Sequence, residues 1–274
     1  MTLQRSVPML LVGGGKMGAA MLRGWLDAGM EPAGVSVLDP HLGDKDAAAL
    51  AGLGVTVARE TKGLLVPQVM VIAVKPQVMD DVLGEVAPLA RAETLVLSVA
   101  AGIPLERYEA AFGPDVAVVR AMPNTPAAVG KGITALIGND LVGEDQHTIA
   151  EALSRAVGDV IWLSDEAHMD AVTGVSGSGP AYVFLMVEAL ADAGVAAGLD
   201  AESAVLLARQ TVIGAGALLD ASDLPASTLR RNVTSPGGTT QAALDRLMAE
   251  DGLALLMRQA VGAATRRSRE LSGN

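Results

Sequence analysis

The chain has 274 residues, half of them hydrophobic and only 2% aromatic, with a net charge of −11 and no cysteine. This length is enough for one large domain or two ordinary ones. The excess of 31 acidic over 20 basic residues argues against a nucleic-acid partner. Without cysteine there are no disulfides, thiolate nucleophiles or usual zinc sites, and three scattered histidines do not predict a metal centre.

The N-terminal segment does not have the pattern of a secretory signal, because Met1–Pro8 carries one arginine and the apolar run after it soon meets glycine. No stretch approaches the roughly 18 consecutive apolar residues that a membrane helix needs. The longest charge-free span, Ala171–Val187, is interrupted by glycine, serine and proline. We therefore expect a soluble, cytoplasmic protein without a membrane partner.

Up to about residue 163, short apolar runs alternate with alanine-rich helical segments, which is typical of a parallel sheet with helices on both faces. The predicted strands are Met9–Val12, Val35–Leu38, Val69–Val74, Thr94–Val99, Val116–Arg120, Thr134–Ile137 and Val160–Leu163. The predicted helices are Met17–Ala28, Lys45–Leu53, Pro76–Leu89, Leu105–Phe112 and Glu144–Val157.

From residue 164 onward the periodicity is helical and no convincing strand occurs. The predicted helices are Pro180–Ala197, Ala201–Leu219, Gln241–Glu250 and Leu253–Leu271. The composition changes as well, because all five lysines lie at or before Lys131. We predict an α/β domain over 1–163 and an all-helical domain over 164–274.

The first predicted strand runs into Gly13, Gly15 and Gly18, spaced as GxGxxG. In a dinucleotide-binding fold the first glycine permits a tight turn, the second lets the backbone approach the pyrophosphate, and the third lets helix pack on strand. The helix start at Lys16 and Met17 would offer free N–H groups to the phosphates. A plain glycine turn is the alternative, but the position between strand and helix favours a dinucleotide.

Asp39 ends the second predicted strand, 21 positions after Gly18. An acidic residue near this spacing accepts hydrogen bonds from the adenosine ribose and repels a 2′-phosphate, which favours NAD over NADP. Asp39-Pro40 would equally serve as a turn that ends the strand. No arginine follows immediately, and the nearby cationic candidates are His41 and Lys45.

Three further loops follow predicted strands, so they lie on the edge of the sheet where doubly wound folds bind ligands. These loops are residues 73–76, 98–102 and 120–126. In the first, Lys75 could reach phosphate or nicotinamide, and in the second, small residues let a flat nicotinamide ring approach the backbone. Each loop alone could be an ordinary turn, but their shared edge favours a cofactor cleft. The predicted contacts in these loops are Ala73, Val74, Lys75, Pro76, Ala100, Ala101, Gly102 and Asn124.

Two polar, glycine-rich segments stand out in the second half, Gly174–Tyr182 and Asn232–Thr240, and each leads into a predicted helix. Their hydroxyls and free amides at a helix N-terminus suit a small carboxylate. Either segment could be a plain helix cap. The second is richer in hydroxyls and glycines than a cap requires, so we expect it to be a substrate loop.

The second half also lacks an obvious general base, because no lysine follows Lys131 and His168 is the last histidine. Oxidation of an alcohol needs such a base. Reduction of a C=N bond needs mainly alignment, anchoring of a carboxylate and a hydroxyl near the nitrogen. The pattern favours imine reduction, with a hydroxy-acid dehydrogenase of the same two-domain plan and a non-catalytic dinucleotide-binding protein as alternatives.

Six segments resemble, in order, those of bacterial pyrroline-5-carboxylate reductases, the last enzymes of proline synthesis. They are VGGGKMG (12–18), AVKP (73–76), SVAAG (98–102), RAMPNTPAAVGKG (120–132), AVTGVSGSGPAYVF (171–184) and LRRNVTSPGGTTQAAL (229–244). The resemblance implies a Rossmann-type doubly wound sheet followed by a helical domain that binds substrate and dimerises by intertwining, often within larger rings. It implies hydride transfer from NADPH or NADH to the imine carbon of 1-pyrroline-5-carboxylate, giving L-proline.

By the same resemblance, the second polar segment holds the substrate carboxylate, and Thr240 lies near the ring nitrogen. The implied catalytic residues are Thr240 and Ser235, and the implied substrate contacts are Asn232, Gly237, Gly238, Thr239, Thr240 and Asp223. Relatives generally prefer NADPH and often carry hydroxyls or basic groups after the second strand, whereas this chain has Asp39 there. The preference between NADH and NADPH, the oligomer size beyond a homodimer and the acceptance of other cyclic imines therefore stay open.

Overall fold

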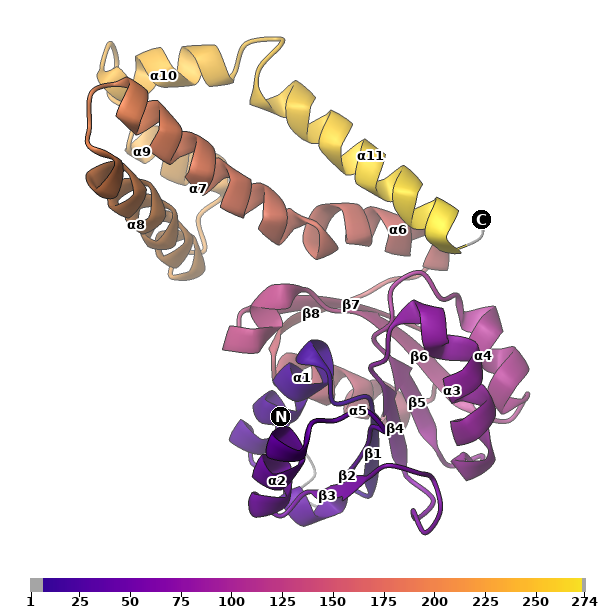
Figure 1. The fold of residues 1–274 in the computed structure, drawn as a ribbon. Helices are drawn as coiled ribbons and strands as arrows, with labels where there is room; N and C mark the ends of the chain where they lie inside the picture. The colour runs from indigo at the N-terminus through magenta and orange to yellow at the C-terminus, as the bar shows by residue number, and fades with distance from the viewer. Residues whose placement is uncertain (1–6, 273–274) are drawn as a thin grey trace. The chain divides into compact units, whose positions relative to one another are not determined.

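The computed structural model describes residues 7–272, which form two compact units (Figure 1). Within these residues the first unit takes 7–177 and 264–272, and the second takes 178–263. The units therefore divide after Gly177 rather than at the predicted 163/164 boundary, because the segment that follows the sheet and the end of the last helix both pack with the first unit.

The first unit contains an eight-stranded sheet of order β3-β2-β1-β4-β5-β6-β7-β8. Its strands are β1 (Met9–Val12), β2 (Val35–Leu38), β3 (Thr56–Ala58), β4 (Val69–Ile72), β5 (Leu95–Ser98), β6 (Ala117–Met122), β7 (Gly132–Gly138) and β8 (Gly158–Trp162). All seven predicted strands are confirmed, with boundary shifts at most of them, and β3 is an additional edge strand.

The prediction of a parallel sheet holds for every strand pair except β6 and β7, which are antiparallel. The connection between these two strands is residues 123–131, and it contains one short 3₁₀ turn, Thr125–Val129. A parallel pair needs a crossover connection of a dozen or more residues, so this link permits only the antiparallel arrangement.

Helices cover both faces of the sheet, which explains why β1, β4 and β5 are buried along their whole length (Figure 1). One core cluster lies around Trp25, with α1 and α5; the other lies around Tyr108, with α3 and α4. The helices of this unit are α1 (Lys16–Asp27), α2 (Asp44–Gly52), α3 (Met79–Val86), α4 (Leu105–Phe112), α5 (Glu144–Arg155) and α6 (Met169–Val172).

The remaining helices are α7 (Gly179–Ala196), α8 (Ala201–Asp220), α9 (Ala226–Asn232), α10 (Thr239–Leu247) and α11 (Leu253–Ser272), whose last turns belong to the first unit. As predicted, no strand occurs beyond β8 in the described part of the chain. Helices α7 and α8 pack closely, since a Cβ on Gly194 would lie 3.2 Å from the Cβ of Ala204. Large apolar side chains nevertheless remain exposed on both, among them Phe184 (63%) and Leu206 (66%).

The helical run Glu166–Ala196 is long and apolar enough to span a membrane by length and composition, and only 6% of its most apolar window is buried within the chain. The same properties describe a helix that packs against another protein surface. This measure therefore does not decide the predicted absence of a membrane partner, which stays a prediction.

Trp25 provides a test of the core. Its side chain is fully buried, and its indole Nε1–H donates to the carbonyl oxygen of Leu153 at 2.9 Å. That carbonyl lies in the last turn of α5, where no intrahelical donor is available. Trp25→Phe should lower the free energy of unfolding by about 1–3 kcal/mol in urea denaturation. Trp162→Phe, at a partly exposed site, should lower the free energy of unfolding by less. Equal decreases for the two variants would contradict a special contribution of the buried Trp25 hydrogen bond.

Candidate functional site

The glycine-rich turn joins β1 to α1 at a contact that leaves no room for side chains. Gly13 has a φ of +98°, and a Cβ there would lie 2.7 Å from the carbonyl oxygen of Ala73. A Cβ on Gly18 would overlap the carbonyl oxygen of Gly13. Gly15 has open space around it and precedes α1 without any side-chain cap. The first N–H groups of α1, from Lys16 on, are thus available to an anion.

The carboxylate of Asp39 is tied to this turn. Its Oδ2 accepts the Gly14 N–H at 2.8 Å, and its Oδ1 accepts the His41 N–H at 2.9 Å. Each oxygen keeps a further lone pair, so these bonds fix the carboxylate without using all of its acceptor capacity. His41 and Lys45 are both exposed beyond the end of β2.

Three of the predicted loops meet at one pocket of about 550 Å³. It lies at the carboxyl ends of β1, β2 and β4 and is also lined by side chains of α3. The sequence-predicted residues in its wall are Gly13, Gly15, Asp39, Ala73, Val74 and Lys75. Lys16 lines a separate groove between α1 and α2, and Pro76 begins the 3₁₀ turn that follows Lys75.

The other two predicted cofactor loops do not line this pocket. Ala100 is buried, and Gly102 has a φ of +75° in the turn after β5. Asn124 is also buried, and its side-chain amide has internal partners: Oδ1 accepts the Ile133 N–H at 3.0 Å, and Nδ2 donates to the carbonyl oxygen of Ser176 at 3.2 Å. The role of Asn124 as a cofactor contact stays a prediction.

The first polar segment differs from its predicted form. Thr173–Gly177 forms a π-helical turn that continues α6, and a Cβ on Gly177 would crowd Met122 at 2.8 Å. The Ser176 hydroxyl donates to the carbonyl oxygen of Val172 at 3.1 Å. The expectation that this segment offers free hydroxyls at a helix N-terminus is therefore wrong at Ser176, because its hydroxyl already bonds within a helical turn.

The second polar segment has the predicted form. Gly237 has a φ of +68°, and Gly238 precedes α10 without any side-chain cap. Thr239 and Thr240 are the first two residues of that helix. Within the described part of the chain, the hydroxyls of Ser235, Thr239 and Thr240 form no hydrogen bond. This helix start therefore offers both free N–H groups and free hydroxyls.

Asn232 and Asp223, the other implied substrate contacts, are exposed. Asn232 is the last residue of α9, and Asp223 lies in the connection between α8 and α9. Neither side chain forms a hydrogen bond with another described residue. The structure thus leaves their polar groups free without joining them to Thr240.

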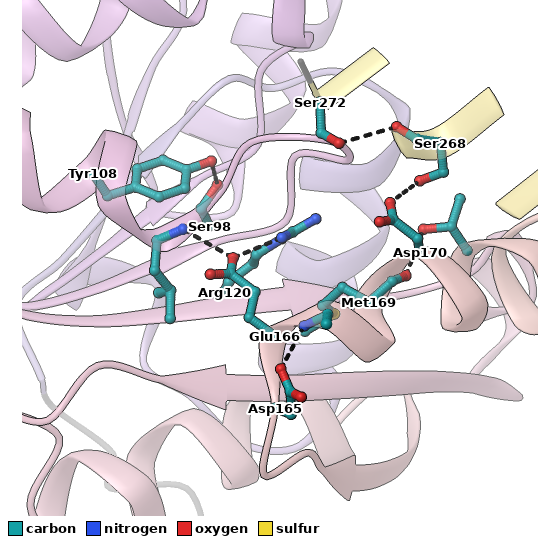
Figure 2. A network of polar contacts seen from close by, with 12 residues as sticks. Ser98, Tyr108, Arg120, Asp165, Glu166, Met169, Asp170, Ser268 and Ser272 are labelled. Atoms are coloured by element: carbon teal, nitrogen blue, oxygen red, sulfur yellow. Dashed lines mark hydrogen bonds and ion pairs between the residues drawn. The ribbon is translucent and has the colours of Figure 1, made fainter. Parts of the chain in front are cut away.

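The first unit also contains a polar network that the sequence does not predict (Figure 2). Arg120 is buried within β6 and forms an ion pair with Glu166 at 2.7 Å. Tyr108 and Ser98 share a buried hydrogen bond of 2.5 Å, and burial raises the pKa of Tyr108 to about 12. Arg120 was the available signal, since it is a charge inside an apolar strand. Over residues 7–272, no three acidic or histidine side chains are grouped so as to hold a metal ion.

Mutation can distinguish a structural role of Asn124 from a role in cofactor binding. Asn124→Ala would leave the Ile133 N–H and the Ser176 carbonyl without their partner, which should lower the free energy of unfolding by about 1–3 kcal/mol. Asn232→Ala, at an exposed side chain without internal bonds, should change it by less than about 0.5 kcal/mol. Unchanged stability of Asn124→Ala together with weaker dinucleotide binding would show that Asn124 is instead a cofactor contact.

Two family models match the chain. One, described as pyrroline-5-carboxylate reductase dimerisation, covers residues 166–271, and one described as NADP oxidoreductase, coenzyme F420-dependent, covers residues 9–102. Pyrroline-5-carboxylate reductase of Pseudomonas aeruginosa is 42% identical over 95% of both chains, and that of Pisum sativum is 39% identical over 98% of both.

Solved structures agree with these relatives. A pyrroline-5-carboxylate reductase from Coxiella burnetii superimposes with a TM-score of 0.90 at 37% identity, over 97% of this chain and 98% of that one. The Plasmodium falciparum enzyme, solved with NADP bound, gives a TM-score of 0.81 at 28% identity, over 98% of this chain and 99% of that one. The chain belongs to the pyrroline-5-carboxylate reductase family.

Proposed function

We propose that the chain reduces the C=N bond of 1-pyrroline-5-carboxylate to L-proline with a reduced nicotinamide dinucleotide as hydride donor. The observation that carries this proposal is the start of α10, where free N–H groups and the free hydroxyls of Thr239 and Thr240 stand together. The family relationship supports the same reaction, whereas nothing in the structure favours a hydroxy-acid dehydrogenase or a non-catalytic dinucleotide-binding protein.

The first unit has a place that fits the dinucleotide. Side chains at Gly13 and Gly18 are sterically excluded, and Gly15 leaves open space before the uncapped start of α1. The backbone from Gly15 to Gly18 would hold the pyrophosphate, and Asp39 would face the adenosine ribose in the adjoining pocket. The nicotinamide end would lie outside that pocket, against the small residues of the turn Ala100–Gly102, as the sequence predicts. When bound, the reduced nicotinamide supplies the hydride that the imine carbon accepts.

The second unit would hold the substrate. The free N–H groups of Thr239 and Thr240 would bind its carboxylate at the positive end of the α10 dipole. Gly238 would leave room for the carboxylate, while its own N–H donates to the carbonyl oxygen of Ser235 at 3.0 Å. The hydroxyl of Thr240 would lie near the ring nitrogen and orient it, and Ser235 would line the same turn. Because a protonated imine is already electrophilic, orientation of the two reactants contributes most of what these residues must supply.

The family model for dimerisation supports a homo-oligomer. We assign the exposed apolar faces of α7 and α8 to that contact, since side chains such as Leu185 and Leu218 are more than half exposed in the single chain. Burial of apolar area drives protein association, and a second copy of the same helices would supply it. A homodimer or a larger ring both satisfy this requirement.

The activity test uses the purified chain with pyrroline-5-carboxylate and either NADPH or NADH, followed by loss of absorbance at the dinucleotide band. Turnover should depend on both reactants. No oxidation of either dinucleotide would refute the proposed function.

Thr240→Ala tests the residue proposed to orient the ring nitrogen. It should lower kcat by about 10- to 100-fold, in the range found when one positioned hydrogen-bond donor is removed, with little change in melting temperature. Thr234→Ala is a matched control, because the Thr234 hydroxyl already donates to the carbonyl oxygen of Arg230. If Thr240 were only a helix cap, its loss would instead lower stability by about 1 kcal/mol and leave kcat unchanged.

Asp39 should make the chain favour NADH over NADPH, because its fixed carboxylate accepts from ribose hydroxyls and repels a 2′-phosphate. Asp39→Asn removes the charge, so the ratio of kcat/KM for NADH to that for NADPH should fall by about tenfold. His41→Ala is the control, because it removes the nearby cationic side chain and leaves Asp39 in place. His41 donates to Asp39 only through its backbone N–H, which the variant keeps. A strong preference of the unmodified chain for NADPH would contradict this role of Asp39.

A further inference from the structure

Glu166 connects parts of the first unit that are far apart in the sequence (Figure 2). Its Oε1 accepts the backbone N–H of Leu105 at 2.9 Å and a hydrogen bond from Nη1 of Arg120 at 2.7 Å. These partners are 61 and 46 residues away from it along the chain. One carboxylate oxygen therefore holds together the start of α4, strand β6 and the segment that follows β8.

The bond to Leu105 completes the start of α4. Pro104 occupies the cap position of this helix and contributes no side-chain hydrogen bond. The free N–H groups at a helix start need acceptors, and Glu166 supplies one from a distant segment. Removing Glu166 would leave the Leu105 N–H without an acceptor and would free the loop that leads into α4.

A second polar contact holds the other end of that loop. Ser98 ends β5, and its Oγ accepts the Ala100 N–H at 3.3 Å and shares a hydrogen bond with Tyr108 of α4. Ser98 is paired with Arg120 in the sheet register, so the two contacts lie on adjacent strands. The turn Ala100–Gly102 is thus held at both ends by side chains, with Glu166 responsible for the end nearest α4.

Among Ser98, Tyr108, Arg120 and Glu166, the two charged side chains form one ion pair. The side chain of Arg120 is only 6% exposed and that of Glu166 is 29% exposed. Burial raises the pKa of Tyr108 to about 12, so its phenol remains neutral at physiological pH. A buried ion pair stabilises a fold little more than apolar residues of the same volume would, which makes a positioning role the better account of this pair.

The segment that begins with Glu166 is also anchored on its other side. Asp170, one turn later, accepts a hydrogen bond from the Ser268 hydroxyl at 2.6 Å, and both residues are buried. The Arg269 guanidinium lies 3.8 Å from the same carboxylate. Glu166 is therefore held on a fixed backbone segment, and its carboxylate cannot follow a displaced loop.

We propose that Glu166 is a positioning residue for the reduced dinucleotide: through Leu105 and Arg120 it fixes the turn Ala100–Gly102, against which the nicotinamide ring would pack. This inference rests on the cofactor part of the proposed function. Glu166 does not touch the cofactor, and its effect passes through the backbone of the turn. Loss of the clamp must therefore weaken dinucleotide binding even when the imine is absent.

The test compares Glu166→Ala, Glu166→Gln and Glu106→Gln by titrating the fluorescence of the reduced dinucleotide at a temperature where circular dichroism shows each variant to be folded. Glu166→Ala should raise the Kd about tenfold. Glu166→Gln keeps an oxygen that accepts the Leu105 N–H, so it should restore most of the affinity. Glu106→Gln removes a charge from the same helix start without touching the clamp, and its Kd should stay within about twofold of the unmodified chain.

Steady-state kinetics adds a second readout. For Glu166→Ala the KM for the dinucleotide should rise with the Kd, while the KM for the imine at saturating dinucleotide stays within about twofold. If Glu166→Ala does not fold, the pair Arg120→Met with Glu166→Ala removes the unpaired buried charge and should show the same weakened binding. A lower melting temperature with an unchanged Kd, in whichever of these variants folds, would overturn the proposal.

The outcomes separate this inference from the proposed function. A chain that binds the dinucleotide without reducing the imine refutes the proposed function, and the Kd comparison still decides the role of Glu166. A chain that binds no reduced dinucleotide refutes both.

Discussion

The close contact between β1 and α1 is the constraint on which the candidate cofactor site depends. Gly18 lies so near the carbonyl oxygen of Gly13 that no side chain fits, and Gly13 itself lies against Ala73 of the neighbouring loop. This contact brings the uncapped start of α1 to the edge of the sheet. It also brings the Gly14 N–H within reach of Asp39, so that a single carboxylate connects the turn after β1 with the turn after β2.

The same edge of the sheet explains why polar residues gather in a mostly apolar unit. Strands β1, β4 and β5 are buried along their whole length, so the polar groups proposed to meet the cofactor lie in the loops at the carboxyl ends of strands. Arg120 is the exception, a charge inside a buried strand. It remains there because Glu166 supplies both a counter-charge and a hydrogen bond. The ion pair thereby places a charged group inside the sheet, two residues before the end of β6.

Local patterns predicted most of the secondary structure, because buried strands and amphipathic helices leave a clear periodicity in the sequence. The misses share a physical cause. Strand β3 has three residues and lies at an edge with no buried position, and α9 has seven residues, so neither leaves a usable pattern. The segment Thr173–Gly177 contains two glycines and a serine, which are typical of a loop, yet it forms a π-helical turn in which Gly177 lies against Met122.

The candidate site was predictable to the extent that its residues are close in sequence. The GxGxxG turn and the helix start at Thr239 and Thr240 each lie within a few residues of chain, and the structure has both in the predicted form. The Glu166 clamp joins residues separated by 46 and 61 positions, and sequence separation of this kind carries no local signal. The apolar residues on either side of Arg120 in the sequence indicate that it is buried. They do not indicate which carboxylate forms its ion pair.

The helical half of the chain accounts for part of the high hydrophobic content. Half of the residues are hydrophobic, yet many of the large apolar side chains on α7 and α8 remain exposed in a single copy. The family model for dimerisation spans 166–271, which includes these helices and also the turn at Ser235 and the start of α10. The surface that needs a partner and the loop proposed to bind substrate therefore belong to one helical region. If association orders that region, its free energy contributes to the substrate site, and activity becomes linked to protein concentration by mass action.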